Sequence, residues 1–276
     1  MNKQSELRKM RYLTLRNIKL YFKDKMTFLV SLITPLILLV LFIAFLKSTY
    51  EDSILSIIQG FDLDQSLIDA LTGGWLFSSV LATSCITVAF CSGMMVIDKI
   101  NRANIDFMVS PVKKSTLQLS YVLANLFSTF IINFVLLIVG LIYLACVGFY
   151  ITFVDILLIV FGIIITSLFG TILANIIWTF THSQGVVSGV CTLVSALYGF
   201  ICGAYMPIST MGQGMQYFVS LLPGTYATVL FRQGFLNSVL NRMRETLPQG
   251  MINGIASGLD AVSYTHLRAH ETDQYL

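Results

Sequence analysis

Apolar runs of about 20 residues or more recur along most of this chain of 276 residues. An α-helix needs about 20 apolar residues to cross the hydrocarbon core of a bilayer. Only 11% of the residues are charged, whereas a soluble domain carries about a quarter. The predicted fold class is therefore an all-α, polytopic transmembrane helical bundle. Five spans are expected, at residues 26–46, 75–97, 117–146, 153–180 and 185–206.

The apolar stretches become shorter after the fifth predicted span. Two apolar stretches, 215–222 and 226–236, are each too short to cross a bilayer, and Pro223-Gly224 separates them. Such stretches are typical of re-entrant or interfacial segments. The segment that follows, 247–259, is polar and rich in glycine.

The first 25 residues contain eight of the 17 Lys and Arg residues. On a helix turning about 100° per residue, residues 5–24 place most basic side chains on one arc. The opposite arc carries Leu7, Met10, Thr14, Ile18, Tyr21 and Phe22. A basic amphipathic helix next to a span suits an anionic membrane surface. The alternative is a solvated basic tail.

The charges of the connecting segments predict the orientation. The segment 48–74 has no Lys or Arg, and its acidic residues are Glu51, Asp52, Asp62, Asp64 and Asp69. The segment 98–114 is basic again, with Lys99, Arg102, Lys113 and Lys114. Because basic loops stay in the cytoplasm, we expect a cytoplasmic N-terminus, with 48–74 and 149–152 outside and 98–114 and 181–184 inside.

The sequence lacks the common motifs of enzyme active sites. No GxxxxGK[ST], HExxH or GxSxG pattern occurs, so we expect no catalytic, cofactor or metal site in this chain. Asp98 and Asp155 lie at span ends, where we expect water to reach them. Ion-coupled transporters need charged groups within their spans, so any transport here is expected to draw its energy from another protein.

Uncharged polar residues within the spans admit two interpretations. Asn125, Asn133 and Asn175 either line a translocation path or form hydrogen bonds that pack helices together. The five cysteines lie in apolar runs without CxxC spacing, so we interpret them as small core residues rather than redox or metal groups.

Taken together, these features resemble the ABC-2 type permease family, the membrane subunits of ATP-binding-cassette exporters. The resemblance covers residues 1–260. It rests on the helix before the first span, the basic loop 98–114 with Ser110-Pro111, and the stretches 203–207, 222–226 and 231–232. It implies that residues 1–25 form a connecting helix and residues 26–260 the permease domain. It also implies a loop that couples to an ATPase through Arg102, Asp106, Phe107, Ser110 and Pro111.

The same resemblance implies a function. The chain would be a subunit without its own ATPase site that moves a drug, peptide, lipid or polysaccharide out of the cytoplasm. Its expected partners are a cytoplasmic ATPase, a second permease copy or paralogue, and the lipid bilayer, with no nucleic acid. The expected location is the cell membrane of a bacterium. The alternative is a non-transport anchor or assembly subunit, and a neighbouring gene for a Walker-motif ATPase would favour the exporter.

The end of the chain departs from the family pattern of six spans with a cytoplasmic C-terminus. Residues 261–276 contain two of the three histidines and differ in composition from the residues before them. They resemble translated adapter sequence. We therefore interpret 261–276 as a non-native tail and expect the chain to be truncated before a sixth span.

Overall fold

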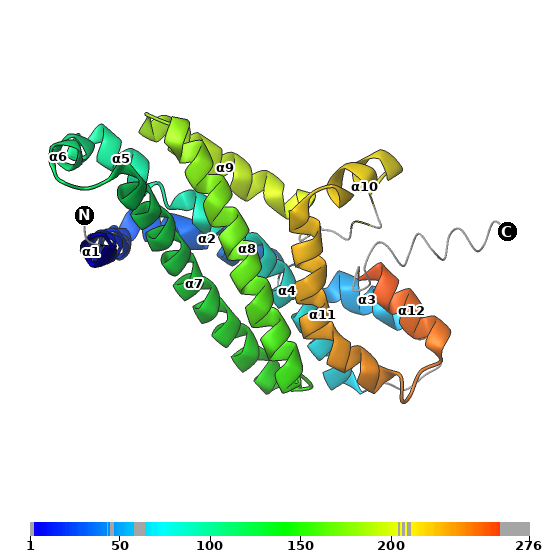
Figure 1. Cartoon of the computed structure of the whole chain (residues 1–276). Coiled ribbons are helices and arrows are strands. Elements are labelled where there is room, and N and C mark those ends of the chain that lie inside the picture. Colours follow the sequence, from blue (N-terminus) through cyan, green and yellow to red (C-terminus); the bar gives the residue numbers. More distant parts are fainter. Residues whose placement is uncertain are drawn as a thin grey trace. The chain divides into compact units, whose positions relative to one another are not determined.

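The computed structural model describes residues 3–42, 44, 47–57, 64–203, 205, 208 and 211–259 (Figure 1). No strand occurs among these residues, and the all-α prediction is confirmed. The predicted tail, 261–276, lies outside the described residues. The helices are α1 (Lys3–Lys23), α2 (Lys25–Leu41), α3 (Lys47–Ile57), α4 (Gln65–Cys91), α5 (Met94–Ile100), α6 (Ala103–Val109), α7 (Lys114–Val147), α8 (Phe153–Phe180), α9 (Gln184–Ile201), α10 (Gln213–Ser220), α11 (Pro223–Met243) and α12 (Gln249–Gly258).

Four helical segments in the described part of the chain are long and apolar enough to cross a membrane. They are Gln65–Ile100, Lys114–Val147, Phe153–Phe180 and Gln184–Ile201. The predicted first span corresponds to α2, which has 17 residues and follows α1 after a bend of 75°. If α1 and α2 count as one bent span, the described residues hold five. The chain is therefore a polytopic helical bundle.

Two segments outside the predicted spans contain helices. Within 48–74, α3 is helical and α4 begins at Gln65 rather than at residue 75. The extra turns of α4 form because Leu67, Ile68 and Leu71 are buried, although polar residues interrupt the apolar run there. Likewise, the segment 247–259 contains α12, which buries Ile252. Asp62 lies outside the described residues.

The predicted fifth span is shorter than expected, because α9 ends at Ile201 rather than at residue 206. Gly203 follows with a φ of 71°, the left-handed conformation that commonly terminates helices. The two short apolar stretches after it form α10 and the first half of α11. Pro223 occupies the first turn of α11, where its missing N–H costs no hydrogen bond.

The span formed by α4 and α5 is far more buried than the other candidates. Its most apolar window is 94% buried, compared with 17% for α9. The hydroxyl groups of Thr72, Ser78 and Thr83 donate to carbonyls of α4 itself, as Ser78 does to Trp75 O at 2.7 Å. These bonds satisfy polar atoms that have no access to water. By contrast, Phe134, Phe161 and Leu193 are exposed, as expected for helices that face lipid.

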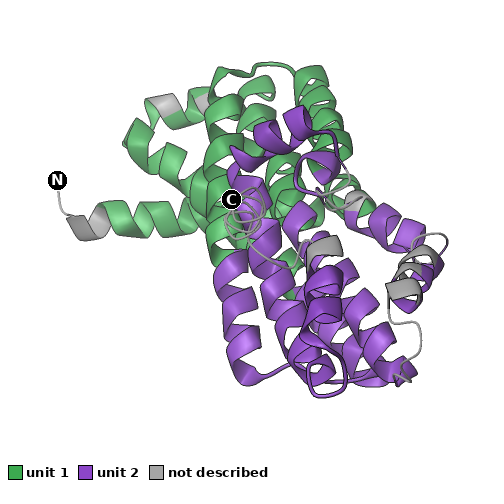
Figure 2. Ribbon diagram, turned by 90° about the vertical axis from the view of Figure 1, so that its right-hand side faces the viewer, with its two compact units in different colours: residues 1–34, 84–134, 164–198 green, residues 35–83, 135–163, 199–276 purple. Residues whose placement is uncertain are grey.

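The chain divides into two compact units (Figure 2). Unit 1 consists of residues 1–34, 84–134 and 164–198, and unit 2 of residues 35–83, 135–163 and 199–276. Unit 1 holds all three segments predicted to be cytoplasmic, and unit 2 holds those predicted to be external. Each unit therefore gathers segments that the predicted topology assigns to the same side of the membrane, and that topology stays a prediction.

The core of unit 1 surrounds a break between α4 and α5. The rings of Phe90 and Trp178 meet edge-on there, with centroids 6.1 Å apart, and Tyr121 belongs to the same cluster. Gly93 sits in the break, where a Cβ atom would lie 2.8 Å from Cγ1 of Val187. Only glycine fits this approach without a shift of α9. The break gives α5 its position at the start of the predicted coupling loop.

Candidate functional site

The predicted coupling loop, 98–114, consists of two short helices joined by tight turns. α5 ends at Ile100, α6 follows, and α7 begins at Lys114. Arg102 adopts the left-handed conformation, with a φ of 58°, which is uncommon for a residue other than glycine. Beyond α6, the Ser110 hydroxyl donates to the carbonyl of Phe107 at 2.8 Å. These turns place α6 as a compact element between α5 and α7.

Four of the five predicted coupling residues fall into two groups, and Ser110 donates to Phe107 within the loop. Arg102 and Asp106 are exposed. Phe107 is half-buried, with the guanidinium carbon of Arg16 5.3 Å from its ring centroid. Pro111 accepts a hydrogen bond on its carbonyl from Nζ of Lys9 at 2.7 Å. Phe107 and Pro111 thus contact α1, whereas Arg102 and Asp106 are available to a partner. Contact with an ATPase stays a prediction for all five residues.

An ion pair that the sequence analysis did not predict joins α1 to α5. Arg16 donates from Nη1 to Asp98 Oδ2 at 2.7 Å and from Nη2 to Oδ1 at 3.0 Å. The Tyr121 hydroxyl of α7 donates to the same Oδ2 at 2.6 Å. Bidentate pairs of this kind are among the stronger hydrogen bonds in proteins. The expectation that water reaches Asp98 was wrong, because the residue is 4% exposed and protein donors replace the water.

A second contact ties the first turn of α1 to α7. The Thr116 hydroxyl donates to Glu6 Oε2 at 2.8 Å, and Nζ of Lys9 lies 3.1 Å from Glu6 Oε1. α1 is thus attached to α7 near residue 6, to the turn after α6 near residue 9, and to α5 at residue 16.

Asp155 is also buried, at 5% exposed, contrary to expectation. Its carboxylate accepts a hydrogen bond from the backbone N–H of Thr152 at 3.0 Å and others from the hydroxyls of Thr152 and Ser238. Thr152 directly precedes α8, so the Asp155 side chain satisfies a backbone N–H at the start of this helix that has no partner within the helix.

The buried face of α1 differs from the predicted apolar arc. Thr14, Asn17 and Tyr21 are buried, whereas Leu7 is exposed. Their spacing of three and four residues places them on one face of the helix. Asn17 was not among the residues of the predicted arc. α1 therefore packs on the protein along a face that is polar and aromatic.

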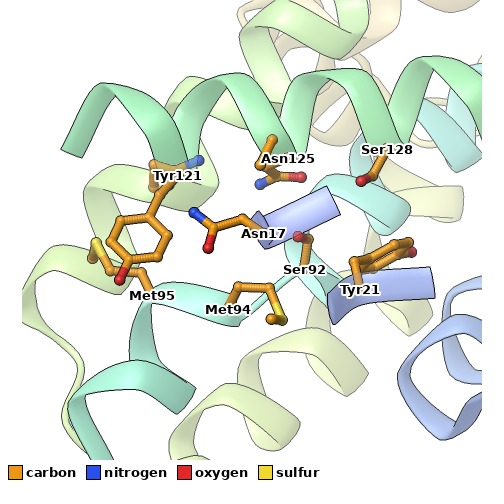
Figure 3. A pocket seen from close by; sticks show the side chains of 10 residues that line it. Asn17, Tyr21, Ser92, Met94, Met95, Tyr121, Asn125 and Ser128 are labelled. Atoms are coloured by element: carbon orange, nitrogen blue, oxygen red, sulfur yellow. The ribbon is translucent and has the colours of Figure 1, made fainter. Parts of the chain in front are cut away.

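Figure 3 shows the small cavity where α1 meets α7 and the break between α4 and α5. Asn17 and Tyr21 come from α1, Asn125 and Ser128 from α7, and Ser92 from the break. The cavity volume is about 10 Å³, roughly what one water molecule needs. Among the described residues, Asn17 Nδ2 and Ser128 Oγ have no hydrogen-bond partner. The surface on which α1 packs is therefore polar rather than a dry apolar contact.

Lys99 fixes α5 to the end of α8. Its Nζ donates to the carbonyls of Trp178 and Thr179, both at 2.8 Å, and of Thr181 at 3.1 Å. The last carbonyls of a helix lack partners within the helix and carry partial negative charge. A lysine at this place stabilises the helix end. The neighbouring residues Asp98 and Lys99 thus link α5 to α1, α7 and the end of α8.

The three predicted intramembrane asparagines are all buried. Asn125 donates to the carbonyl of Ala89 at 2.9 Å. Asn133 accepts from the hydroxyl of Ser84. Both bonds join α7 to α4, which favours the helix-packing interpretation. Asn175 donates to Thr171 O at 2.8 Å within α8, and a role in translocation stays a prediction.

The cysteines are only partly explained as small core residues. Cys91 of α4 and Cys191 of α9 form a disulfide, with their Cα atoms 5.6 Å apart. They are 100 residues apart in the chain, so no local sequence motif predicts this disulfide. Cys85 and Cys202 are buried, and Cys146 is exposed. In the part of the chain that the structure describes, no cluster of three or more His, Cys, Asp or Glu side chains is arranged to hold a metal ion.

Comparison with protein families identifies the architecture. The family described as ABC-2 type transporter matches residues 8–236, from α1 into α11. Comparisons with curated proteins and with solved structures found no match. The matched range contains the α5–α6 loop and the four candidate spans. Because the match covers most of the chain, this protein belongs to the ABC-2 type transporter family as a multi-pass membrane permease component.

Proposed function

We propose that this permease subunit moves cargo out of the cytoplasm with energy from ATP that a separate cytoplasmic subunit hydrolyses. It would work in a bacterial cytoplasmic membrane, paired with a second copy or a paralogue. Family membership supports the kind of partner, because ABC-2 permeases typically work with an ATPase subunit. The cargo would be a drug, peptide, lipid or polysaccharide.

This proposal rests on the arrangement of α6. A soluble ATPase can move membrane helices only through an element that contacts both, and packed contacts transmit a displacement better than a flexible tether. α6 presents Arg102 and Asp106 at the surface. The adjoining residues Asp98 and Lys99 bind α1, α7 and the end of α8. A displacement of α6 would therefore reach α1, α7 and the end of α8 through α5.

The sharpest test changes exposed charges, because Phe107 has a second role inside the subunit. Phe107→Ala removes the ring beneath Arg16 and would loosen α1 whether or not an ATPase docks there. Asp106→Lys and Arg102→Glu alter only the exposed surface. The control is Asp52→Lys, an exposed aspartate on the predicted external side. The partner is the ATPase whose gene neighbours that of the permease.

We expect Asp106→Lys and Arg102→Glu to reduce the yield of co-purified ATPase several-fold, because like charges brought together across an interface destabilise it. Substrate-stimulated ATP hydrolysis should fall with it, and the control should behave as the wild type. Unchanged complex yield and ATP hydrolysis in both variants would refute docking at α6. Equal losses in the control would show that only the net charge of the subunit matters, which also contradicts the proposal.

A further inference from the structure

Unit 1 contains a groove between the first two turns of α1 and the start of α7. Its volume is about 220 Å³, below the roughly 300 Å³ at which pockets for compact small molecules begin. Its apolar lining comes from Leu7 and Met10 of α1 and from Leu119 of α7. Leu7 is 54% exposed and Leu119 is 47% exposed, so the groove is open along one side. This shape suits a slender alkyl chain better than a compact molecule.

The groove lies at one end of a candidate membrane span. That span, Lys114–Val147, has 34 residues, which as a helix are about 51 Å long. The hydrocarbon core of a bilayer is only about 30 Å thick, so the ends of α7 reach the headgroup region. Ser115 and Thr116 line the groove in the first turn of α7, and Leu119 lies about one turn further along the span. The groove therefore runs from the headgroup region towards the hydrocarbon.

Accessible basic side chains border the groove. Arg8 and Arg11 follow the lining residues of α1 directly in sequence, and Lys114 directly precedes those of α7. We call these three residues the basic rim. All three are exposed, so their charges are open to a ligand. Glu6, the carboxylate in the lining, is already paired with Lys9 at 3.1 Å. The surroundings of the groove thus favour a ligand that combines an alkyl chain with a negative charge.

We propose that this groove binds one anionic phospholipid, with part of an acyl chain against Leu7, Met10 and Leu119 and the phosphate facing the basic rim. The acyl chain removes exposed apolar side chains from water. Each Lys or Arg near the membrane surface adds to the attraction of an anionic headgroup. This site goes beyond the transport function and does not depend on it, because all of its residues belong to this chain and neither ATP nor an ATPase is involved.

The test is photo-crosslinking of the purified full-length protein in phosphatidylcholine nanodiscs. These contain a small share of phosphatidylglycerol that carries a diazirine in one acyl chain. Mass spectrometry locates the lipid adducts, which we expect on the peptides that contain Leu7, Met10 or Leu119. Added unlabelled phosphatidylglycerol should suppress these adducts, although phosphatidylcholine is already in large excess.

Two variants test the two parts of the site. Arg11→Gln combined with Lys114→Gln should lower the adduct yield about tenfold or more, because two charges that attract the phosphate are lost. The matched control is Lys19→Gln combined with Lys23→Gln, which removes the same net charge from exposed positions of α1 that do not line the groove. Leu119→Trp fills the groove without changing any charge, and it should abolish the adducts.

An unchanged adduct yield in the rim variant or in Leu119→Trp would overturn the proposal. So would an equal loss in the control variant, since only the net charge of α1 would then matter. Equal adducts from a diazirine-labelled phosphatidylcholine would assign the groove to any bilayer lipid. Suppression by inorganic phosphate would assign the basic rim to a free anion, and suppression by the ATPase would assign the groove to that subunit. Each of these three outcomes would equally contradict an anionic lipid site.

Discussion

Replacing Asp98 by asparagine should weaken the attachment of α1 more than any change to an exposed charge in the same loop. The carboxylate accepts two hydrogen bonds from Arg16 and one from Tyr121. Asparagine has nearly the same shape but offers a single acceptor oxygen and no charge. One bond to Arg16 or Tyr121 is therefore lost, and the guanidinium group loses its counter-ion.

The size of the effect follows from the burial of the two partners. Removing one partner of a fully buried ion pair costs about 3–5 kcal/mol. Here the side chain of Asp98 is 6% exposed but that of Arg16 is 35% exposed, so water recovers part of the arginine's solvation. A hydrogen bond to a charged group contributes about 1.5–3 kcal/mol. We expect Asp98→Asn to lower the free energy of unfolding by about 2 kcal/mol.

Denaturant unfolding of the purified protein, followed by tryptophan fluorescence, measures this change. Trp178 is buried in unit 1 and reports on the same part of the molecule. The matched control is Asp106→Asn, an exposed aspartate in the same loop, which should stay within about 0.5 kcal/mol of the wild type. A cycle with Arg16→Gln should give a coupling energy above about 1 kcal/mol. Equal stability of the two aspartate variants, or additive effects in the cycle, would refute the reasoning.

Three further predictions concern packing, topology and charge. Gly93→Ala should destabilise the protein by about 1–3 kcal/mol through overpacking against α9, whereas Gly189→Ala, with no atom within 4 Å, should be neutral or stabilising in thermal unfolding; equal effects would contradict this. A cysteine at Asp52, in a background without exposed native cysteines, should react only with reagent added outside the cell, and labelling from the cytoplasm alone would invert the topology. The hydrogen bond to Asp69 raises the pKa of Lys47 above 10.5. The stability that this ion pair contributes is therefore complete below pH 10.5 and is lost as pH rises through the raised pKa of Lys47. NMR titration of methylated Lys47 should show a lower titration midpoint in Asp69→Asn. An unchanged midpoint would contradict the assignment of the pKa shift to Asp69.

Helices with continuous apolar runs could be predicted from the sequence, and those with mixed composition could not. The span 153–180 coincides with α8, because a turn and a capping threonine bound its apolar run. The start of α4 at Gln65 was missed, because Asp69 interrupts the hydropathy pattern. A helix is maintained by backbone hydrogen bonds, which a polar side chain does not break. Hydropathy therefore predicts the apolar part of such a helix better than its ends.

The contacts of the candidate site depend on pairs far apart in the chain. Arg16 and Asp98 are 82 residues apart, and each alone suggests a solvated charge. Asn17, which the predicted apolar arc did not include, is buried. Only the folded arrangement shows that their partners come from α5 and α7. The position of the segment 98–114 between two spans was predictable, but the residues that hold it to α1 were not, and its coupling role stays a prediction.

The three attachments of α1 have a consequence for how this helix moves. They lie at residues 6, 9 and 16, and ten residues of helix span about 15 Å. A rigid helix held in its first two turns and again near its middle cannot lift at its N-terminal end without straining the contact at residue 16. Backbone amides along α1 should therefore exchange their hydrogens with solvent in a single cooperative opening rather than by fraying from the N-terminus. When α6 is displaced, α1 should tilt as one body with it.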